Sequence, residues 1–281
     1  MKLMRVGPMG AEKPALLDDG GIIRDLSGQV DDIAAEVLSE AGLAKLRALD
    51  PSTLPAVPEG TRIGPCVGRI GKLCCVGLNY ADHAAETGAP ILEEPILFGK
   101  AVTSVCGPSD GIETPRGSDA LDYEVEIAIV IGKTAKNVSE ADALDHVAGY
   151  AVFNDVSERT FQIKRSGQWL KGKSHDTFGP LGPWLVTKDE IADVGNLDMY
   201  CDVNGERRQT GNTKTLIFGI ATVVSYISQF MTLYPGDVIP TGTPPGVALG
   251  MKEPKWLKPG DVVELGIAGL GRQRQTVLPE N

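Results

Sequence analysis

The amino-acid sequence predicts an α+β fold in which β-strands predominate. Short runs of β-branched and aromatic residues with period-two alternation recur between turn signals. The 34 glycines and 19 prolines favour many turns and strands over long helices. The expected elements do not form a regular alternation of strand and helix, so neither a TIM barrel nor a doubly wound sheet fits. We therefore expect a mainly β protein with a few short helices.

The first part of the chain, residues 1–65, is predicted to form a small N-terminal α+β domain. Its strands are expected at 2–6, 13–17 and 22–26. The last two strands are joined by Asp18-Asp19-Gly20-Gly21, a strong hairpin signal. Helical periodicity extends over 31–48 with a break near Gly42, and a linker rich in proline and glycine follows. This unit contains no histidine and no cluster of reactive side chains, so we expect it to pack on the remaining chain or to help it dimerise.

The second part, residues 70–281, is predicted to form a larger catalytic domain. Its strands are expected at 72–77, 96–100, 123–131, 149–154, 182–186, 198–203, 237–240 and 261–267. Its helices are expected at 80–87, 139–147 and 217–229. In the last helix, apolar residues recur every three or four positions, which is typical of a helix that packs on a core.

The composition is that of an ordinary globular protein, with 42% hydrophobic and 23% charged residues. The net charge of −10 and the lack of a basic stripe argue against nucleic acid or an anionic membrane as a partner. No apolar run approaches the roughly 20 residues that span a bilayer, and no signal-peptide pattern is seen. The five cysteines include no C-x-x-C pair, which predicts buried thiols, a reducing cytoplasm and no zinc site.

Three carboxylates share one face of the stretch 122–131, which contains the strand expected at 123–131. With period-two alternation, Asp122, Glu124 and Glu126 point one way and the apolar residues point the other. Like charges side by side on a sheet face repel one another. A hard divalent cation such as Mg²⁺ or Ca²⁺ would turn that repulsion into binding. The simpler alternative is a solvated edge strand with an acidic outer face.

Another carboxylate follows the next apolar strand. Asp155 comes directly after the strand expected at 149–154, and a carboxylate at a strand end is a suitable third oxygen ligand. The alternative is an ordinary aspartate that caps the following helix.

A possible general base lies in the helix expected at 80–87, where His83 and Glu86 are three residues apart and share one face. A carboxylate beside an imidazole orients the ring and raises its basicity, which suits a base that activates water. A surface pair without catalytic consequence is the alternative. His146 and His175 have no such neighbour and are expected to be structural.

Two glycine-containing loops complete the candidate chemistry. Lys173 lies in Lys171-Gly172-Lys173-Ser174, where it could neutralise an anionic substrate or stabilise a developing enolate. A solvated loop lysine is the alternative. The segment 235–247 combines threonines with glycines and prolines. It predicts a rigid loop whose amides and hydroxyls can hold carboxylate or carbonyl oxygens, or else a plain multi-turn loop.

Five ordered motifs over residues 70–270 resemble the fumarylacetoacetate hydrolase family. They are Val76-Gly77-Leu78-Asn79-Tyr80-Ala81-Asp82-His83, Tyr123-Glu124-Val125-Glu126, the segment 149–157 that ends in Asn154-Asp155-Val156-Ser157, Lys173-Ser174 with Phe178-Gly179-Pro180, and the segment 236–244 that ends in Thr241-Gly242-Thr243-Pro244. The N-terminal unit of about 65 residues resembles that of bacterial members described as ureidoglycolate lyases or 2,4-diketo-3-deoxy-sugar-acid hydrolases.

The resemblance implies a mixed β-roll catalytic domain, usually dimeric, that holds Mg²⁺ or Mn²⁺ through two strand glutamates and one aspartate. By position, the metal ligands fall on Glu124, Glu126 and Asp155. The catalytic residues fall on His83 and Glu86, as a lid dyad, and on Lys173. Substrate contacts fall on Tyr80, Gln162 and Thr243.

On this resemblance we expect a Mg²⁺-dependent hydrolase that cleaves a C–C bond in a 2,4-diketo acid, either an acylpyruvate or a 2,4-diketo-3-deoxy sugar acid. The product would be pyruvate or a related 2-oxo or 2-hydroxy acid. A ureidoglycolate lyase or an oxaloacetate-type decarboxylase on the same scaffold is an alternative. A metal-binding interaction protein without turnover is the non-enzymatic alternative. The expected partners are a small anionic 2-oxo acid and a second copy of the chain.

Overall fold

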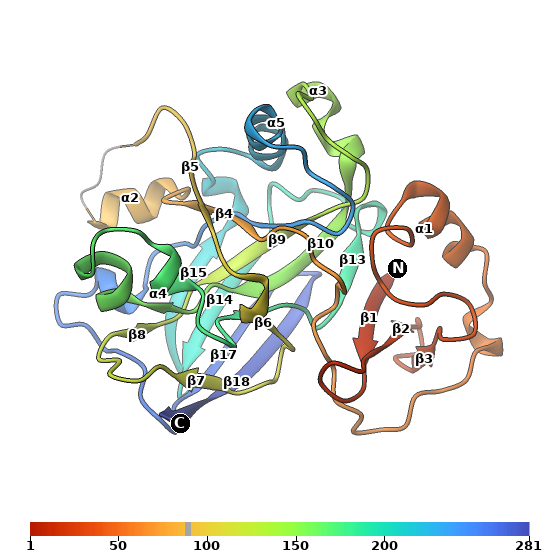
Figure 1. The fold of residues 1–281 in the computed structure, drawn as a ribbon, viewed down its shortest axis with the longest axis horizontal. Coiled ribbons are helices and arrows are strands. Elements are labelled where there is room, and N and C mark those ends of the chain that lie inside the picture. The colour runs from red at the N-terminus through yellow and green to blue at the C-terminus, as the bar shows by residue number, and fades with distance from the viewer. Residues whose placement is uncertain (88–90, 281) are drawn as a thin grey trace.

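The computed structural model describes residues 1–87 and 91–280, without the side chains of His83, Ala85 and Thr87. Strands cross the centre of the molecule and short helices lie at its periphery (Figure 1). The expected mainly β, α+β class is confirmed.

The larger sheet joins both halves of the chain. Its strand order is β16 (Val238–Pro240), β9 (Val125–Ile131), β10 (Val147–Asn154), β13 (Leu185–Thr187), β1 (Lys2–Val6), β2 (Lys13–Leu17) and β3 (Ile23–Asp25). β1 pairs with β13 on one side and with β2 on the other. The sheet therefore crosses the expected boundary at residues 65–70, and the division into two domains stays a prediction.

β9 is a central strand and is buried on both faces. It lies between β16 and β10, and every one of its residues is buried. Ile127, Ile129 and Ile131 pack in one core cluster, while Ala128 and Val130 pack in another. The predicted alternation is thus confirmed, but the alternative of a solvated edge strand is wrong, because the acidic face also points into the protein.

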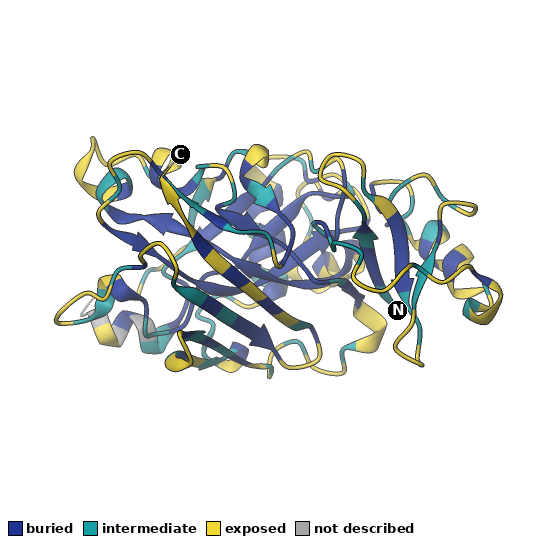
Figure 2. Cartoon of the chain, turned by 90° about the horizontal axis from the view of Figure 1, so that it is seen from below, coloured by how far each residue is buried: buried dark blue, intermediate teal, exposed yellow. Residues whose placement is uncertain are grey.

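The second sheet has the order β15 (Glu206–Asn212), β14 (Asp198–Val203), β17 (Val262–Ile267), β18 (Gly271–Glu280) and β7 (Ile112–Thr114). Figure 2 shows buried and exposed positions alternating along β18, the strand that leads to the C-terminus. The sequence analysis did not predict β15 or β18. In β18 the reason is that glutamines occupy buried positions: the Gln273 side chain donates to Val152 O at 2.9 Å, and Gln275 donates to Pro108 O at 2.7 Å.

The helices are short. They are α1 (Glu40–Arg47), α2 (Ala81–Thr87), α3 (Glu140–Ala143), α4 (Leu170–Lys173) and α5 (Ile220–Phe230). The helix expected over 31–48 is wrong in its first half, since the chain forms turns up to Ser39. Ser39 starts α1 by accepting a hydrogen bond from the Gly42 amide at 3.1 Å. Gly42 therefore lies inside the helix and does not break it.

Short paired segments surround the sheets. They are β4 (Cys74–Gly77) with β5 (Ile96–Gly99), β6 (Val105–Cys106) with β12 (Gly179–Pro180), and β8 (Leu121–Asp122) with β11 (Ser157–Glu158). A one-turn π-helix spans Thr160–Lys164. All five cysteines are buried with free thiols. In the part of the chain that the structure describes, no helix has the length and apolar character needed to cross a membrane.

Candidate metal centre and active site

Three carboxylates from two neighbouring strands meet in the interior. β9 and β10 run antiparallel, with Glu126 opposite Phe153. Asp155 directly follows β10, and its amide donates to Glu124 O at 2.9 Å. One carboxylate oxygen from each of Glu124, Glu126 and Asp155 lies within 4.8 Å of the others, and all three residues are buried. The register of one strand pair thus assembles these three residues, which we call the acidic cluster.

Two buried lysines contact the acidic cluster. The Lys173 ammonium donates to Glu124 at 2.7 Å and to Asp155 at 2.8 Å. Lys100, which directly follows β5, also donates to Asp155. Lys173 is only 2% exposed, so the alternative of a solvated loop lysine is wrong. Carboxylates taken out of water need such partners, because an unpaired buried charge is strongly unfavourable.

Arg159 provides a third cation and bridges Asp122 to the cluster. Its guanidinium donates to Glu124 at 2.6 Å and to Asp122 at 2.9 Å. Asp122 also accepts hydrogen bonds from the amides of Ala248 at 2.8 Å and Leu249 at 3.1 Å. Asp122 was expected on the same face as the two glutamates. Its carboxylate instead holds Arg159 and a turn near the cavity, because the strand is interrupted between β8 and β9.

The cations act unequally on the two glutamates. Burial on its own would raise the pKa of Glu124, but Arg159 and Lys173 outweigh it and lower that pKa. The pKa of Glu126 is raised well above its usual range by burial and by the two neighbouring carboxylates. Among the described residues, no cation pairs with Glu126, whose carboxylate accepts a hydrogen bond from the Gly242 amide at 2.9 Å. A further positive charge beside Glu126 would therefore stabilise the cluster.

The loop after β16 is held in place to give this hydrogen bond. The Asn79 side chain donates to Thr241 O at 2.9 Å and to Phe218 O at 3.0 Å. Gly242 has a φ of +98°, and a Cβ there would lie 3.0 Å from the Asn79 Cβ. Only glycine suits both the left-handed backbone and this close approach.

The acidic cluster opens into a cavity of about 200 Å³. One part of its lining is charged, with Glu124, Glu126, Arg159 and Lys173. The other part is mainly apolar, with Val76, Leu78, Phe98, Ile163, Trp169 and Leu249. Three buried carboxylates form an oxygen donor set of the kind that Mg²⁺ and Mn²⁺ prefer, so the cluster can hold a divalent metal.

Two of the expected substrate contacts line this cavity. Gln162 is buried, and its side-chain oxygen accepts a hydrogen bond from Arg159 at 2.9 Å. The Thr243 hydroxyl donates to Val125 O at 2.9 Å and accepts from the Gln209 amide at 2.8 Å. Both side chains are therefore fixed in position, and their contact with substrate stays a prediction.

Of the other expected residues, Tyr80 and Glu86 are not among the described residues that line the cavity. Tyr80 is fully buried in the core, and its hydroxyl lies 3.1 Å from Met199 Sδ. Glu86 is exposed on α2 and accepts a hydrogen bond from the Gly246 amide at 3.3 Å. The His83 side chain lies outside the described residues, so the dyad stays a prediction.

Sequence reasoning missed the partners of the acidic cluster, Lys100 and Arg159. One signal for Lys100 was available, because a lysine at the end of the apolar run 96–99 is unusual unless it has a buried partner. Arg159 has no comparable local signal. Its pairing with Asp122 and Glu124 depends on contacts between segments that lie 35 or more residues apart.

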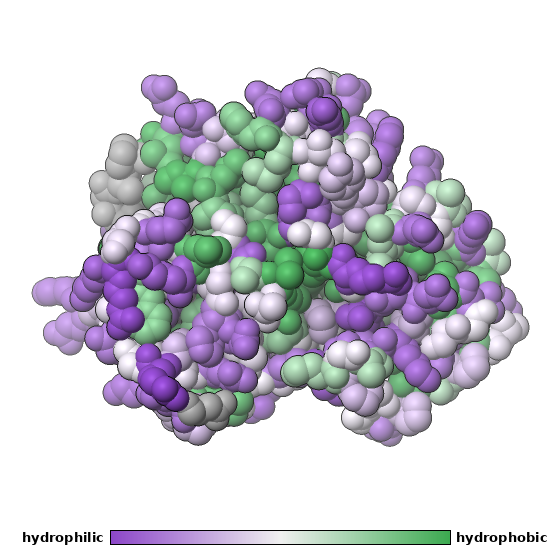
Figure 3. Space-filling view, viewed as in Figure 1, coloured by the Kyte–Doolittle hydropathy of each residue, from purple (hydrophilic) through white to green (hydrophobic). Residues whose placement is uncertain are grey.

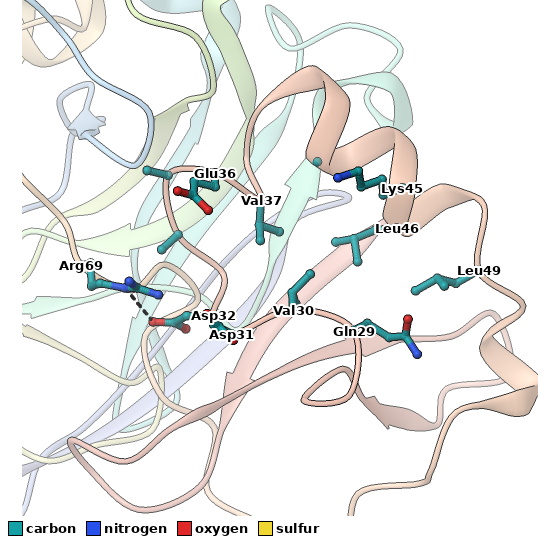
Figure 4. A pocket seen from close by; sticks show the side chains of 13 residues that line it. Gln29, Val30, Asp31, Asp32, Glu36, Val37, Lys45, Leu46, Leu49 and Arg69 are labelled. Carbon is teal, nitrogen blue, oxygen red and sulfur yellow. Dashed lines mark ion pairs between the residues drawn. The ribbon is translucent and has the colours of Figure 1, made fainter.

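A larger cavity, of about 650 Å³, lies in the N-terminal part (Figure 4). Its side chains come from the segment 29–49 and from Arg69, which lies 3.8 Å from Asp32. Among the described residues, the acidic cluster is the group of side chains that can ligate a metal. We therefore place the candidate active site in the smaller cavity.

The family model for the C-terminal region of fumarylacetoacetate hydrolase matches residues 72–278. The chain belongs to this family. Membership in the fumarylacetoacetate hydrolase family fits the acidic cluster, since both β9 and Asp155 lie within the matched region.

Proteins that resemble this chain over its full length are named for different activities. A protein of Burkholderia multivorans named as a candidate hydrolase is 60% identical over 276 residues, which cover 98% of each chain. The 5-carboxymethyl-2-hydroxymuconate delta-isomerase of Mycobacterium smegmatis has a TM-score of 0.80 at 32% identity, with 100% of both chains covered. Maleylpyruvate hydrolase of Sphingobium sp. SYK-6, solved with manganese(II) and pyruvate, has a TM-score of 0.83 at 28% identity, again with 100% of both chains covered.

Proposed function

We propose that the protein is a Mg²⁺- or Mn²⁺-dependent hydrolase that cleaves a C–C bond of a 2,4-diketo acid. The products would be pyruvate, or a related 2-oxo acid, and a carboxylic acid. One arrangement carries the proposal: Glu124, Glu126 and Asp155 gather with a buried lysine at one end of a cavity. The relative solved with manganese(II) and pyruvate supports it.

The acidic cluster would hold the metal ion. When bound, the ion supplies a Lewis acid for the 2-oxo-carboxylate end of the substrate. Lys173 lies within hydrogen-bond distance of two of the three ligands. Its ammonium is therefore placed to stabilise the negative charge that develops on the leaving pyruvate enolate.

The dyad of His83 and Glu86 would activate the water that hydrolysis consumes. His83, oriented by Glu86, would take a proton from water as the hydroxyl oxygen attacks the distal carbonyl carbon. The bond between that carbon and the methylene carbon then breaks, and its electron pair goes to the methylene carbon. This carbon takes up a proton, so one water is consumed and the atoms balance.

The same residues could serve other reactions of 2-oxo acids. The likeness to a delta-isomerase favours an isomerase as the second candidate, and a ureidoglycolate lyase or an oxaloacetate-type decarboxylase remains an alternative. A histidine–glutamate pair for activating water favours hydrolysis over these. In a metal-binding interaction protein, Lys173 would only balance the charge of the buried carboxylates.

Pyruvate release from acylpyruvates, measured with and without EDTA, tests the proposal. We expect release that EDTA abolishes and that added Mn²⁺ restores. Release that is indifferent to EDTA would contradict the metal requirement. Loss of CO₂ from oxaloacetate without cleavage of any acylpyruvate would favour the decarboxylase.

His83→Ala is expected to lower kcat for acylpyruvate hydrolysis by at least about 10²-fold, because a general base typically contributes 10²- to 10⁴-fold. Glu86→Gln should lower kcat by a similar factor. The double variant should have a kcat only slightly lower than that of either single variant, because the two residues act as a unit. Steady-state kinetics measures the effect, and Mn²⁺ affinity serves as the control. A His83→Ala enzyme that turns over normally would exclude activation of water by this residue.

Metal binding is expected to stabilise the protein. A ligand that binds only the folded state contributes about 2.7 kcal/mol at a hundredfold excess over its Kd. The melting temperature should therefore rise with Mn²⁺ or Mg²⁺ and fall with EDTA. Differential scanning calorimetry measures this shift, and an unchanged melting temperature would count against a metal bound by the acidic cluster.

A further inference from the structure

We infer that the substrate ends in a short apolar tail and not in a second carboxylate. The inference rests on the proposed function, because it concerns the part of the 2,4-diketo acid beyond the distal carbonyl. It is carried by the division of the cavity into a charged part and an apolar part.

The apolar part of the cavity is built from large side chains. Phe98 and Trp169 lie edge to face, with ring centroids 5.1 Å apart. Ile163 and Leu249, which also line the cavity, remain 48% and 42% exposed. Figure 3 shows apolar side chains gathered around β5, the strand that carries Phe98. A tail laid over these side chains would remove apolar surface from water, which favours binding.

The wall at Trp169 is preformed. The Trp169 ring lies against Gly77 at the end of β4, where a Cβ would come within 2.7 Å of the ring. Phe98 also packs against the ring. Because the ring is held between these two residues, it offers a fixed apolar surface that needs no rearrangement when a tail binds.

The cations of the cavity are already paired. Among the described residues that line the cavity, Arg159 and Lys173 are the cations, and each donates to two carboxylates. Lys164 and Lys171 are exposed on neighbouring turns and do not line the cavity. A second substrate carboxylate would therefore lie against the apolar wall without a charged partner among the described lining residues, which is unfavourable.

The tail is also limited in length. The cavity volume of about 200 Å³ is smaller than the roughly 300–1,000 Å³ typical of sites for drug-sized ligands. The head of the substrate occupies the part beside the acidic cluster. The remaining space suits a tail of a few carbons that runs toward Ile163 and Leu249.

Carbon-matched substrates test the inference. Butanoylpyruvate and succinylpyruvate have acyl groups of equal carbon number, one ending in a methyl and the other in a carboxylate. We expect kcat/KM to be on the order of 10²-fold higher for butanoylpyruvate. From acetyl- to butanoylpyruvate it should rise about fourfold per methylene. Equal or faster cleavage of succinylpyruvate would overturn the inference while leaving the proposed function in place.

A pair of matched variants tests where the substrate tail binds. Ile163 lines the cavity and Leu170 does not, yet both side chains are 48% exposed and lie on neighbouring helical turns. Ile163→Lys should lower the preference for butanoyl- over succinylpyruvate by roughly tenfold, through lost apolar contact and an added charge. Leu170→Lys should leave it unchanged. Equal effects of the two substitutions, or none at Ile163, would contradict a tail at this wall.

If no diketo acid is cleaved, ligand binding still tests the apolar tail separately from the proposed function. Calorimetry in the presence of Mn²⁺ would compare N-butyl oxamate with N-(2-carboxyethyl) oxamate, which share a head and differ in the end of the tail. Tighter binding of the butyl compound supports the apolar tail even without turnover. Tighter binding of the carboxylated compound, or equal binding of both, would overturn it.

Discussion

Glu126→Gln is expected to lower kcat for 2,4-diketo acid cleavage by about 10³-fold, because the loss of a metal ligand removes several kcal/mol of transition-state stabilisation. The same substitution should not destabilise the metal-free protein. Glutamine keeps an oxygen that can accept the Gly242 hydrogen bond, and it removes a buried carboxylate whose pKa is raised by burial and by its acidic neighbours. Mn²⁺ affinity should fall with the lost ligand. Pyruvate release, urea unfolding in EDTA and Mn²⁺ calorimetry measure the effects on kcat, stability and metal binding.

Glu158→Gln provides the matched control. Glu158 is also fully buried, but it accepts hydrogen bonds from the amides of Ala120 at 3.0 Å and Phe161 at 2.6 Å, through different oxygens. Glutamine can satisfy only one of these amides. We therefore expect a loss of about 2 kcal/mol in the free energy of unfolding, with Mn²⁺ affinity retained. The opposite pattern, with Glu126→Gln unstable and still binding Mn²⁺, would show that the acidic cluster is structural.

Lys173→Met is expected to lower the free energy of unfolding in EDTA by about 3 kcal/mol. Breaking a buried ion pair by removing one partner typically costs 3–5 kcal/mol. The lower end applies because Lys100 still donates to Asp155 and Arg159 still donates to Glu124. The cost should shrink when Mn²⁺ is added, since the ion replaces the lost positive charge. Catalysis should still fall, since the proposed stabilisation of the enolate is gone.

Lys171→Met is the control for this variant, because Lys171 lies on the same short helix and is exposed. It should change stability by no more than about 0.5 kcal/mol. Urea unfolding of both variants, with EDTA and with Mn²⁺, separates a buried charge partner from a surface lysine. If Lys173→Met were as stable as Lys171→Met in EDTA, the ion pairs around the acidic cluster would contribute nothing to folding.

The sequence predicted those parts of the fold that depend on local pattern. β1, β2 and β14 have the expected bounds, because each strand carries its own apolar signal. β18 was missed because its buried glutamines look like surface residues until their hydrogen-bond partners are known. The helix expected over 31–48 was too long. A periodic pattern does not reveal that Ser39, in the middle of this range, is the N-cap at which the helix begins.

The candidate site was predicted unevenly for the same reason. Glu124 and Glu126 share a strand segment, so their spacing indicated the cluster, and Asp155 joined them through the expected strand end. Lys100 had a local signal that was missed, whereas Arg159 is recognised only once the fold brings distant segments together. Charge compensation gives a general guide: three buried carboxylates require cations nearby.

The pairing of β1 with β13 has a consequence for how the chain acquires its structure during synthesis. Lys2 is synthesised long before Val186, its partner in the sheet. β1 can pair with β2 early, while its other edge stays open until most of the protein has been made. Long-range pairing of this kind slows folding and exposes unpaired strand edges. The N-terminal hairpin therefore completes the sheet only after β9 and β10, the strands that assemble the acidic cluster, have been synthesised.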